Sequence, residues 1–253
     1  MFSIQTERGN HWVKICGAKA QAVVASPVFQ SWLKKFDHER LELRRVNIQS
    51  ADIFGERVVF VKMKCDVVNR ETKKPVPGIV FLRGDAVTIL LFVVCKETGD
   101  VYVVTTKQVR VPLGNADFIE LPAGMMDKDD NLVSRAVAEI EEETGLRVKS
   151  KMLRHLGYFS PSAGGCDEEI TCYTATVSVS KRKMKTLAIK LHGVEAENEE
   201  IAIQFRTVRE FLEDMRDSLI TDGKAFAAVM MFLLGNRELL EQTGRRIAHM
   251  VRG

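Results

Sequence analysis

Residues 121 to 146 read LPAGMMDKDDNLVSRAVAEIEEETGL and carry the strongest local signal in the chain. A loop rich in glycine and aspartate leads into a segment whose apolar residues recur at helical spacing, which predicts a helix over residues 132 to 144. Gly145 is expected to end that helix, because glycine adopts the left-handed conformation of a helix C-terminus without strain. The last turns of this helix carry a cluster of glutamates.

Glu139, Glu142 and Glu143 stand at positions i, i+3 and i+4, so their carboxylates are expected to converge on one helix face. Like charges at this spacing repel, and water, a basic neighbour or a metal ion must offset the repulsion. The preceding Pro122-Ala123-Gly124 bends the chain so that backbone carbonyls approach the same place. Carboxylates, a carbonyl and water form a hard oxygen site suited to Mg²⁺ or Mn²⁺. A solvated glutamate face is the alternative that the helix alone leaves open.

The composition limits the class of protein. A chain of 253 residues with 45% hydrophobic residues can bury a sizeable core, and a net charge of +3 is too small to indicate a nucleic-acid-binding protein. Five cysteines without CxxC spacing indicate reduced thiols and a cytoplasmic location, although import into an organelle remains open. The longest apolar run, residues 86 to 95, is about half a membrane span, so a buried strand is expected and no membrane partner.

Strand-like and helix-like segments are mixed along the chain, which predicts the α+β class or an α/β sandwich. Helices are expected to begin at Pro27 with Ser26 as the N-cap, at the capping box of Thr207 and Glu210, and near Asp222. The last of these is apolar nearly all round, which predicts burial of its large residues, namely Phe226, Val229, Met230, Phe232 and Leu233. The basic run 181 to 185 is expected to be a solvated loop. The expected strands cover residues 41–48, 57–66, 78–83, 86–95, 101–111, 153–160, 170–179 and 201–205.

The stretch from Gly124 to Leu146 resembles the Nudix box, G-x5-E-x7-R-E-U-x-E-E-x-G-U, in which U is a bulky apolar residue. The positions in register are Gly124, Glu139, Ile140, Glu142, Glu143, Gly145 and Leu146. Two positions depart from the pattern. Asp130 stands where glutamate is usual, and Ala138 stands where the family has an arginine that pairs with and orients the catalytic glutamates. Arg135, one turn earlier, is expected to replace that arginine only in part.

Other segments are similar to the ADP-ribose/ADP-sugar pyrophosphatase branch of this family, above all to plant-type ADP-sugar diphosphatases. They are PGIVFLRGDAVTILL (77–91), KQVRVP (107–112), IELPAGM (119–125), SPSAGGCDEE (160–169), AENEEI (196–201), SWLKKF (31–36) and DIFGERVVFVKMKCDVVNRET (52–72). The resemblance implies an α/β/α Nudix sandwich with a mixed β-sheet over residues 76–253. It also implies a small N-terminal β-rich domain over residues 1–75, which exchanges between the subunits of a homodimer.

The resemblance assigns roles to individual residues. It makes Glu139 and Glu143 metal ligands, with Glu142 beside them and the Ala123 carbonyl completing the set. Substrate contacts are implied for Arg83, Arg110 and Glu169. The loop from 162 to 169 is expected to supply a further carboxylate, with Glu168 the first candidate for activating the attacking water and Glu169 the second.

Three functional hypotheses follow. The preferred one is an enzyme that uses Mg²⁺ or Mn²⁺ to hydrolyse the pyrophosphate bond of ADP-sugars, ADP-glucose or ADP-ribose, to AMP and a sugar phosphate. The second is a Nudix hydrolase of another nucleoside diphosphate derivative, namely NADH, a UDP-sugar or an RNA 5′ end. The third is a catalytically weakened nucleotide- or RNA-binding protein, suggested by Ala138 and the basic run. Nucleic acid is the less expected partner, because an RNA end would want a longer basic track.

Overall fold

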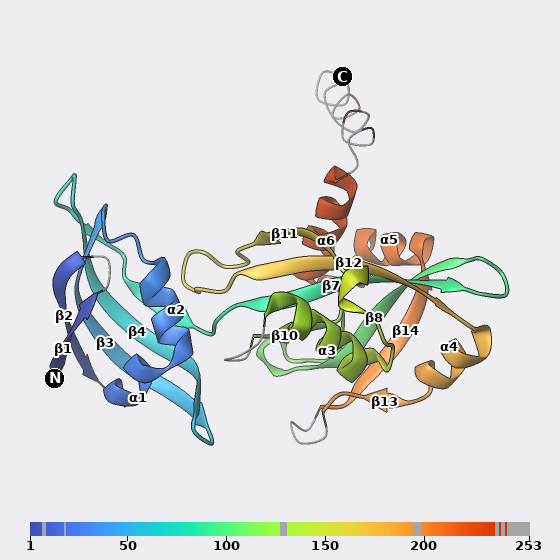
Figure 1. Cartoon of the computed structure of the whole chain (residues 1–253), viewed down its shortest axis with the longest axis horizontal. Helices are drawn as coiled ribbons and strands as arrows, with labels where there is room; N and C mark the ends of the chain where they lie inside the picture. Colours follow the sequence, from blue (N-terminus) through green and yellow to red (C-terminus); the bar gives the residue numbers. More distant parts are fainter. Residues whose placement is uncertain are drawn as a thin grey trace. The chain divides into compact units, whose positions relative to one another are not determined.

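The computed structural model describes residues 1–6, 9–17, 19–126, 131–194 and 199–235, together with Glu238 and Glu241. The chain forms two compact units, which we describe one at a time (Figure 1). The first unit comprises residues 1–85 with 160–169, and the second comprises residues 86–159 with 170–253. Because these units are defined by compactness alone, the expected domain boundary after residue 75 stays a prediction.

The first unit is a β-sheet with two helices. In its described residues, six strands form a sheet in the order β1-β2-β3-β4-β5, with β6 also beside β4, and only β2 and β3 pair in parallel. The strands are β1 (Phe2–Thr6), β2 (Gly9–Gly17), β3 (Leu41–Phe54), β4 (Arg57–Asn69), β5 (Pro75–Val76) and β6 (Ile79–Leu82). The helices are α1 (Ala20–Ala25) and α2 (Pro27–Lys35).

Helix α2 begins where the sequence predicts. The Ser26 hydroxyl accepts a hydrogen bond from the backbone N–H of Phe29, and proline occupies the first helical turn, where its missing N–H costs nothing. Phe29 and Leu33, four residues apart, are buried in the core beneath the sheet. Burial of each such side chain contributes about 1.5–3 kcal/mol, so this apolar face holds the helix in place.

The second unit contains a larger, mixed sheet. Eight strands in its described residues run in the order β11-β12-β7-β8-β14-β13, with β10 also beside β7 and β9 beside β8. The strands are β7 (Ala86–Cys95), β8 (Val101–Arg110), β9 (Asn115–Glu120), β10 (Ala123–Met125), β11 (Arg154–Phe159), β12 (Ile170–Val179), β13 (Leu191–His192) and β14 (Ile201–Thr207). The helices are η1 (Val111–Leu113), α3 (Leu132–Thr144), η2 (Ser150–Met152), α4 (Lys181–Ala188), α5 (Val208–Arg216) and α6 (Gly223–Leu234).

Alternate residues of β7 point to opposite faces of this sheet, and each face has its own core. Ile89 and Leu91 pack with α3 and α4 on one face, whereas Leu90 packs with α5 and α6 on the other. Figure 1 shows the two helix pairs on opposite sides of the strands. Strands β7 and β12 pair in parallel and β8 is antiparallel to β7, so the sheet is mixed. The predicted α/β/α sandwich is therefore confirmed.

One local prediction is wrong, and a second is confirmed only in part. The basic run lies in helix α4, because the Ser180 hydroxyl caps the first turn and Met184 and Leu187 are buried, three residues apart on one face. Helix α6 buries mainly the small residues Ala225 and Ala228. Of its larger apolar residues, Val229 and Phe232 are half-buried against the core, whereas Phe226, Met230 and Leu233 are exposed, since the described residues include no layer that covers them.

All five cysteines are free thiols. Among the described residues, no helix is both long enough and apolar enough to cross a bilayer.

Candidate active site

Helix α3 presents the glutamate cluster, and local sequence fixes both of its ends. The Asn131 side chain accepts a hydrogen bond from the backbone N–H of Ser134, 2.8 Å away, which satisfies a free donor of the first turn. Gly145 ends the helix at φ 64°, as predicted. A Cβ at this position would also meet the His192 ring at 2.9 Å, so glycine is required both by conformation and by space.

Glu139 is one of two buried carboxylates on this helix, with 4% of its surface exposed. Burial raises its pKa to about 7, Arg135 opposes that rise, and Glu142 adds to it. A Cβ on Gly124 would overlap the Glu139 carboxylate. Glycine in β10 therefore leaves the space that this side chain occupies.

Glu143 is the second buried carboxylate, with 3% of its surface exposed. Its Oε2 accepts a hydrogen bond from the backbone N–H of Ala123, at 3.1 Å. Its pKa is raised well above the usual value, first by burial and then by the charge of Glu139, while the Ala123 hydrogen bond acts in the opposite direction. The two buried glutamates are thus neighbours that cannot both ionise cheaply without a cation.

Arg135 brings a positive charge to the cluster. Its guanidinium contacts Glu139 and lies 3.5 Å from Glu142. Ala138 therefore does not leave the glutamates without a cation, because Arg135 reaches two of them from one turn earlier. Glu142 is only half-buried, so the structure brings Glu139 and Glu143 together in the interior and places Glu142 at the edge of the cluster.

The residues present fit a divalent cation in their chemistry. The Oε1 atom of Glu139 is buried and accepts no well-formed hydrogen bond from the described residues, although Arg135 contacts it. Glu139, Glu143 and the Ala123 carbonyl are hard oxygen donors of the kind that Mg²⁺ and Mn²⁺ prefer. In the described part of the chain, no three Asp, Glu, His or Cys side chains gather to hold a metal. Asp130, at the box position usually held by glutamate, lies outside the described residues.

Arg110 belongs to a buried ionic network that the sequence does not predict. Its Nε and Nη2 lie 2.8 Å and 2.7 Å from Oε1 of Glu120, which is 1% exposed. Lys224 Nζ lies 2.7 Å from the other oxygen of Glu120 and 2.9 Å from Asp222. Asp222 in turn accepts a hydrogen bond from the backbone N–H of Leu121, at 3.2 Å. This network fixes the backbone just before Ala123.

The first unit holds the other predicted residues. Arg83 Nε lies 3.3 Å from Oε1 of the buried Glu168. The Asp167 carboxylate accepts hydrogen bonds from the backbone N–H groups of Arg83 and Gly84, at 2.8 Å and 3.3 Å. The loop that carries Glu168 is thus fixed to the segment that carries Arg83, and the half-buried Glu169 follows it.

The sequence reading missed four residues near the acidic pair. Glu120 and Glu199 both carry negative charge that raises the pKa of Glu143, and Glu199 also raises that of Glu139. Glu199 accepts a hydrogen bond from the backbone N–H of Val194, at 3.3 Å. The sequence predicts Asp222 only as the start of a helix, and Lys224 belongs to no sequence pattern that predicts a role. The quoted motifs IELPAGM and AENEEI contain the two glutamates, so position within a motif was the available clue.

Comparison with known proteins gives consistent results. Residues 84–225 match the family model described as "NUDIX domain". The chain is 34% identical over 239 residues to "Nudix hydrolase 14, chloroplastic" of Arabidopsis thaliana, covering 88% of this chain and 75% of that protein. It is 24% identical over 232 residues to "ADP-ribose pyrophosphatase" of Haemophilus influenzae, covering 86% of this chain and 99% of that protein.

A solved structure, titled "Crystal structure of ADP compounds hydrolase", superposes with a TM-score of 0.52 at 14% sequence identity. It covers 81% of this chain and 98% of that one. This likeness concerns the fold.

Proposed function

Because the chain belongs to the Nudix hydrolase family, we propose that it hydrolyses the pyrophosphate bond of ADP-sugars in a reaction that depends on Mg²⁺ or Mn²⁺. ADP-glucose and ADP-ribose are the proposed substrates, and AMP and a sugar phosphate are the products. The observation that carries the proposal is the buried pair Glu139 and Glu143, positioned against Ala123 and Gly124. The Haemophilus relative, named an ADP-ribose pyrophosphatase, supports the substrate class.

Glu139 and Glu143, with the Ala123 carbonyl, would hold the cation, and Glu142 stands beside them. When bound, the ion supplies positive charge that offsets the phosphates and makes water more acidic. The chain's own contribution is orientation. The Ala123 N–H holds one oxygen of Glu143, and Arg135 holds Glu139 and Glu142. The carboxylates are therefore arranged before substrate arrives.

Arg110 is proposed to bind the diphosphate. Its Nε and Nη2 both contact the Glu120 carboxylate, which fixes the plane of the guanidinium. Its Nη1 is left to donate elsewhere. The side chain is 39% exposed, so a phosphate oxygen can reach it. Arg83 is the second proposed phosphate contact, and its Nε forms a single, longer ion pair with Glu168, at 3.3 Å. Glu169 is proposed as a further substrate contact.

The reaction is substitution at phosphorus. The oxygen of water forms a bond to one phosphorus, and the bond from that phosphorus to the bridging oxygen breaks. Glu168 is proposed to accept the proton that the water loses, with Glu169 as the second candidate. The bridging oxygen leaves on the other phosphate, so one monophosphate is AMP and the other is the sugar phosphate.

A homodimer joined through residues 1 to about 75 is also proposed. The proposal follows from the family resemblance, and Trp12 and Phe54 in this region are 65% and 69% exposed and available for a contact. Light scattering that shows a stable monomer at micromolar concentration would refute this.

A cytoplasmic location is proposed from the free thiols, whereas the plant relative's name places that protein in the chloroplast.

A product-resolved screen tests the function. Purified protein is incubated with ADP-glucose, ADP-ribose, ATP, NADH, a UDP-sugar and capped RNA, each with Mg²⁺, Mn²⁺ or EDTA. We expect AMP and a sugar phosphate from the ADP-sugars, with kcat/KM at least about tenfold above that for ATP or capped RNA, equal to roughly 1.4 kcal/mol of discrimination. The reason is charge: two arginines and a cation balance a diphosphate, and a triphosphate adds negative charge near the glutamates.

Two outcomes of the screen contradict the proposal in different ways. Faster turnover of NADH, a UDP-sugar or capped RNA than of every ADP-sugar would replace it with another hydrolase activity. Nucleotide binding without turnover would replace it with a binding role. The contacts of Arg135 with Glu139 and Glu142 argue against that role, because the glutamates keep an orienting cation.

A further inference from the structure

Helix α4 and its surroundings form a basic cavity whose lysines have no role in the proposed hydrolysis. Lys183 of this helix, Lys96 after β7 and Lys190 before β13 line a cavity of about 780 Å³ in the second unit. We propose that this cavity is a second binding site, for a small phosphate-bearing anion. The proposal is independent of the identity of the hydrolysed substrate.

The lysines of the cavity lie toward the far end of the central strands, although the cavity also reaches the C-terminal end of α3. Ala123 pairs with Thr88 near the start of β7, whereas Lys96 and Ser178 line the cavity near the ends of β7 and β12. Gly145, two residues after Glu143, lines it as well. Glu142 lines the cavity, but Glu139, Glu143 and Ala123 do not.

The charges around the cavity are unbalanced in favour of cations. Its lining includes four lysine or arginine side chains and two glutamates. Arg147 is already paired with Glu141 at 2.6 Å, and Glu142 lies 3.5 Å from Arg135. The other three cations, Lys96, Lys183 and Lys190, form no ion pair with any residue that the structure describes. Three ammonium groups around one hollow repel one another, and an anion would relieve that repulsion.

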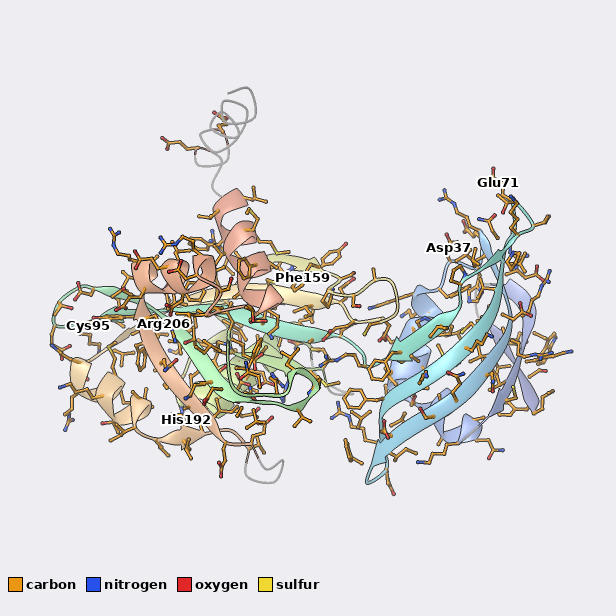
Figure 2. The ribbon with its side chains drawn as sticks, turned by 180° about the vertical axis from the view of Figure 1, so that it is seen from behind. Asp37, Glu71, Cys95, Phe159, His192 and Arg206 are labelled. Atoms are coloured by element: carbon orange, nitrogen blue, oxygen red, sulfur yellow. The ribbon has the colours of Figure 1, made fainter. Side chains whose placement is uncertain are left out.

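The first turn of α4 does not itself supply the anion site. Its Ser180 hydroxyl already accepts from the N–H of Lys183, and Glu97 accepts from the N–H of Lys181 at 2.8 Å. The lysine side chains therefore provide the positive charge. His192, whose Nε2 lies 3.0 Å from the Leu187 carbonyl, forms a fixed wall on β13 beside α4 (Figure 2).

The volume of the cavity is suited to a small molecule. Cavities of about 300–1,000 Å³ accommodate drug-sized ligands, and this one falls within that range. Lysine ammonium groups bind phosphate oxygens as point charges, without requiring a planar fork. A single-stranded nucleic acid would instead need a basic groove that follows its backbone. We therefore expect a compact phosphate or diphosphate group to occupy the site.

Matched removal of two positive charges, at cavity-lining or at other positions, tests the proposal. Isothermal titration calorimetry measures binding of orthophosphate and of pyrophosphate to the full chain in EDTA, for wild type, Lys183→Gln/Lys190→Gln and Arg182→Gln/Lys185→Gln. Both double variants lose the same charge, but only the first loses cavity-lining residues. We expect the cavity variant to bind pyrophosphate at least about tenfold more weakly, and the control variant to bind within about twofold of wild type.

The competing outcomes are distinct. Equal weakening of pyrophosphate binding in both variants would indicate a diffuse basic surface and would overturn the proposal. The absence of detectable binding at millimolar pyrophosphate would also overturn it. A short single-stranded RNA that binds more tightly than pyrophosphate, and loses affinity equally in both variants, would assign the helix to nucleic acid instead. Turnover of ADP-glucose without added phosphate should be unchanged in the cavity variant. Since binding is measured without turnover, failure of the proposed hydrolysis would not affect this test.

Discussion

The carboxylate of Glu143 accepts a hydrogen bond from the backbone N–H of Ala123, with 3.1 Å between Oε2 and the nitrogen. Two residues earlier, the backbone N–H of Leu121 donates to Asp222 at the start of α6. The short segment between Glu120 and Gly124 therefore joins the acidic helix on one side to the ionic network of Lys224 on the other. Its position depends on both, so residues remote from the glutamates in sequence should influence the candidate metal site.

Lys224 is the first test of this dependence. Lys224→Met would leave Asp222 without its lysine and Glu120 with Arg110 alone, so we expect a loss of about 3–5 kcal/mol in the free energy of unfolding. Urea denaturation measures it, with the exposed Lys185→Met as control. Glu120→Gln/Lys224→Met should recover part of the loss, because the uncompensated carboxylate is gone. A Lys224→Met protein as stable as the control would show that the network does not hold this segment.

Gly124 is predicted to be indispensable for the position of Glu139. A Cβ at this residue would overlap the Glu139 carboxylate, so Gly124→Ala must displace a proposed metal ligand. We expect Mg²⁺ affinity and turnover to fall about 10–100-fold while the fold is retained. The control is Gly164→Ala, because a Cβ there meets nothing within 4 Å. Wild-type Mg²⁺ affinity in Gly124→Ala would contradict the assignment of Glu139.

Arg135 is predicted to perform the orienting role that the family box gives to position 138. Arg135→Gln should lower kcat and Mg²⁺ affinity about 10–100-fold, because Glu139 and Glu142 lose their shared cation. Ala138→Arg in the Arg135→Gln background should restore part of the loss. In wild type the same substitution should have little effect, since Arg135 already occupies that role. An Arg135→Gln variant with normal kinetics would show that the pairing has no functional consequence.

Much of this arrangement could be predicted from sequence, where the signal is local. The bounds of α3, its end at Gly145 and the limits of β7 depend on residues that are neighbours in the chain. The ionic network could not be predicted, because Glu120 and Lys224 meet across 104 positions and neither belongs to a periodic pattern. Helix α4 was missed because its charges obscured the spacing of Met184 and Leu187.

The exposure of Phe226 on α6 illustrates a different limit of predicting burial from sequence. Apolar periodicity predicts which side of a helix could be buried, but burial also requires a second layer, and layers are set by the whole fold. Among the site residues, the sequence correctly grouped Glu139 with Glu143. The family resemblance already places Glu142 beside this pair, and in the structure Glu142 is half-buried.

Stability of the metal-free protein is predicted to fall as pH rises from about 4.5 to about 7. The folded-state pKa of Glu139 is about 7 against a usual value of 4.5, so in this window the unfolded chain loses a proton that the folded chain keeps. The folded state therefore binds more protons, and the free energy of unfolding decreases with pH, by about 3 kcal/mol for one such group. Glu143 acts in the same direction.

Urea denaturation in EDTA across this window measures the effect. Glu139→Gln should flatten the dependence, because its amide does not titrate, and Mg²⁺ should stabilise wild type most at the upper end, where it binds the ionised carboxylates. The same slope in Glu139→Gln as in wild type would place the titration elsewhere.

The measurement that tests the central claim most directly compares Mg²⁺-dependent hydrolysis of ADP-ribose by Glu143→Gln and Glu141→Gln. Both substitutions remove one carboxylate charge from α3, but Glu141 is exposed and pairs with Arg147 at the surface, whereas Glu143 is buried against Ala123. We predict that Glu143→Gln retains its fold and loses at least about a hundredfold in kcat/KM, equal to about 2.7 kcal/mol, while Glu141→Gln stays within about twofold of wild type. Full turnover by Glu143→Gln in Mg²⁺, or an equal loss in both variants, would contradict the proposed site.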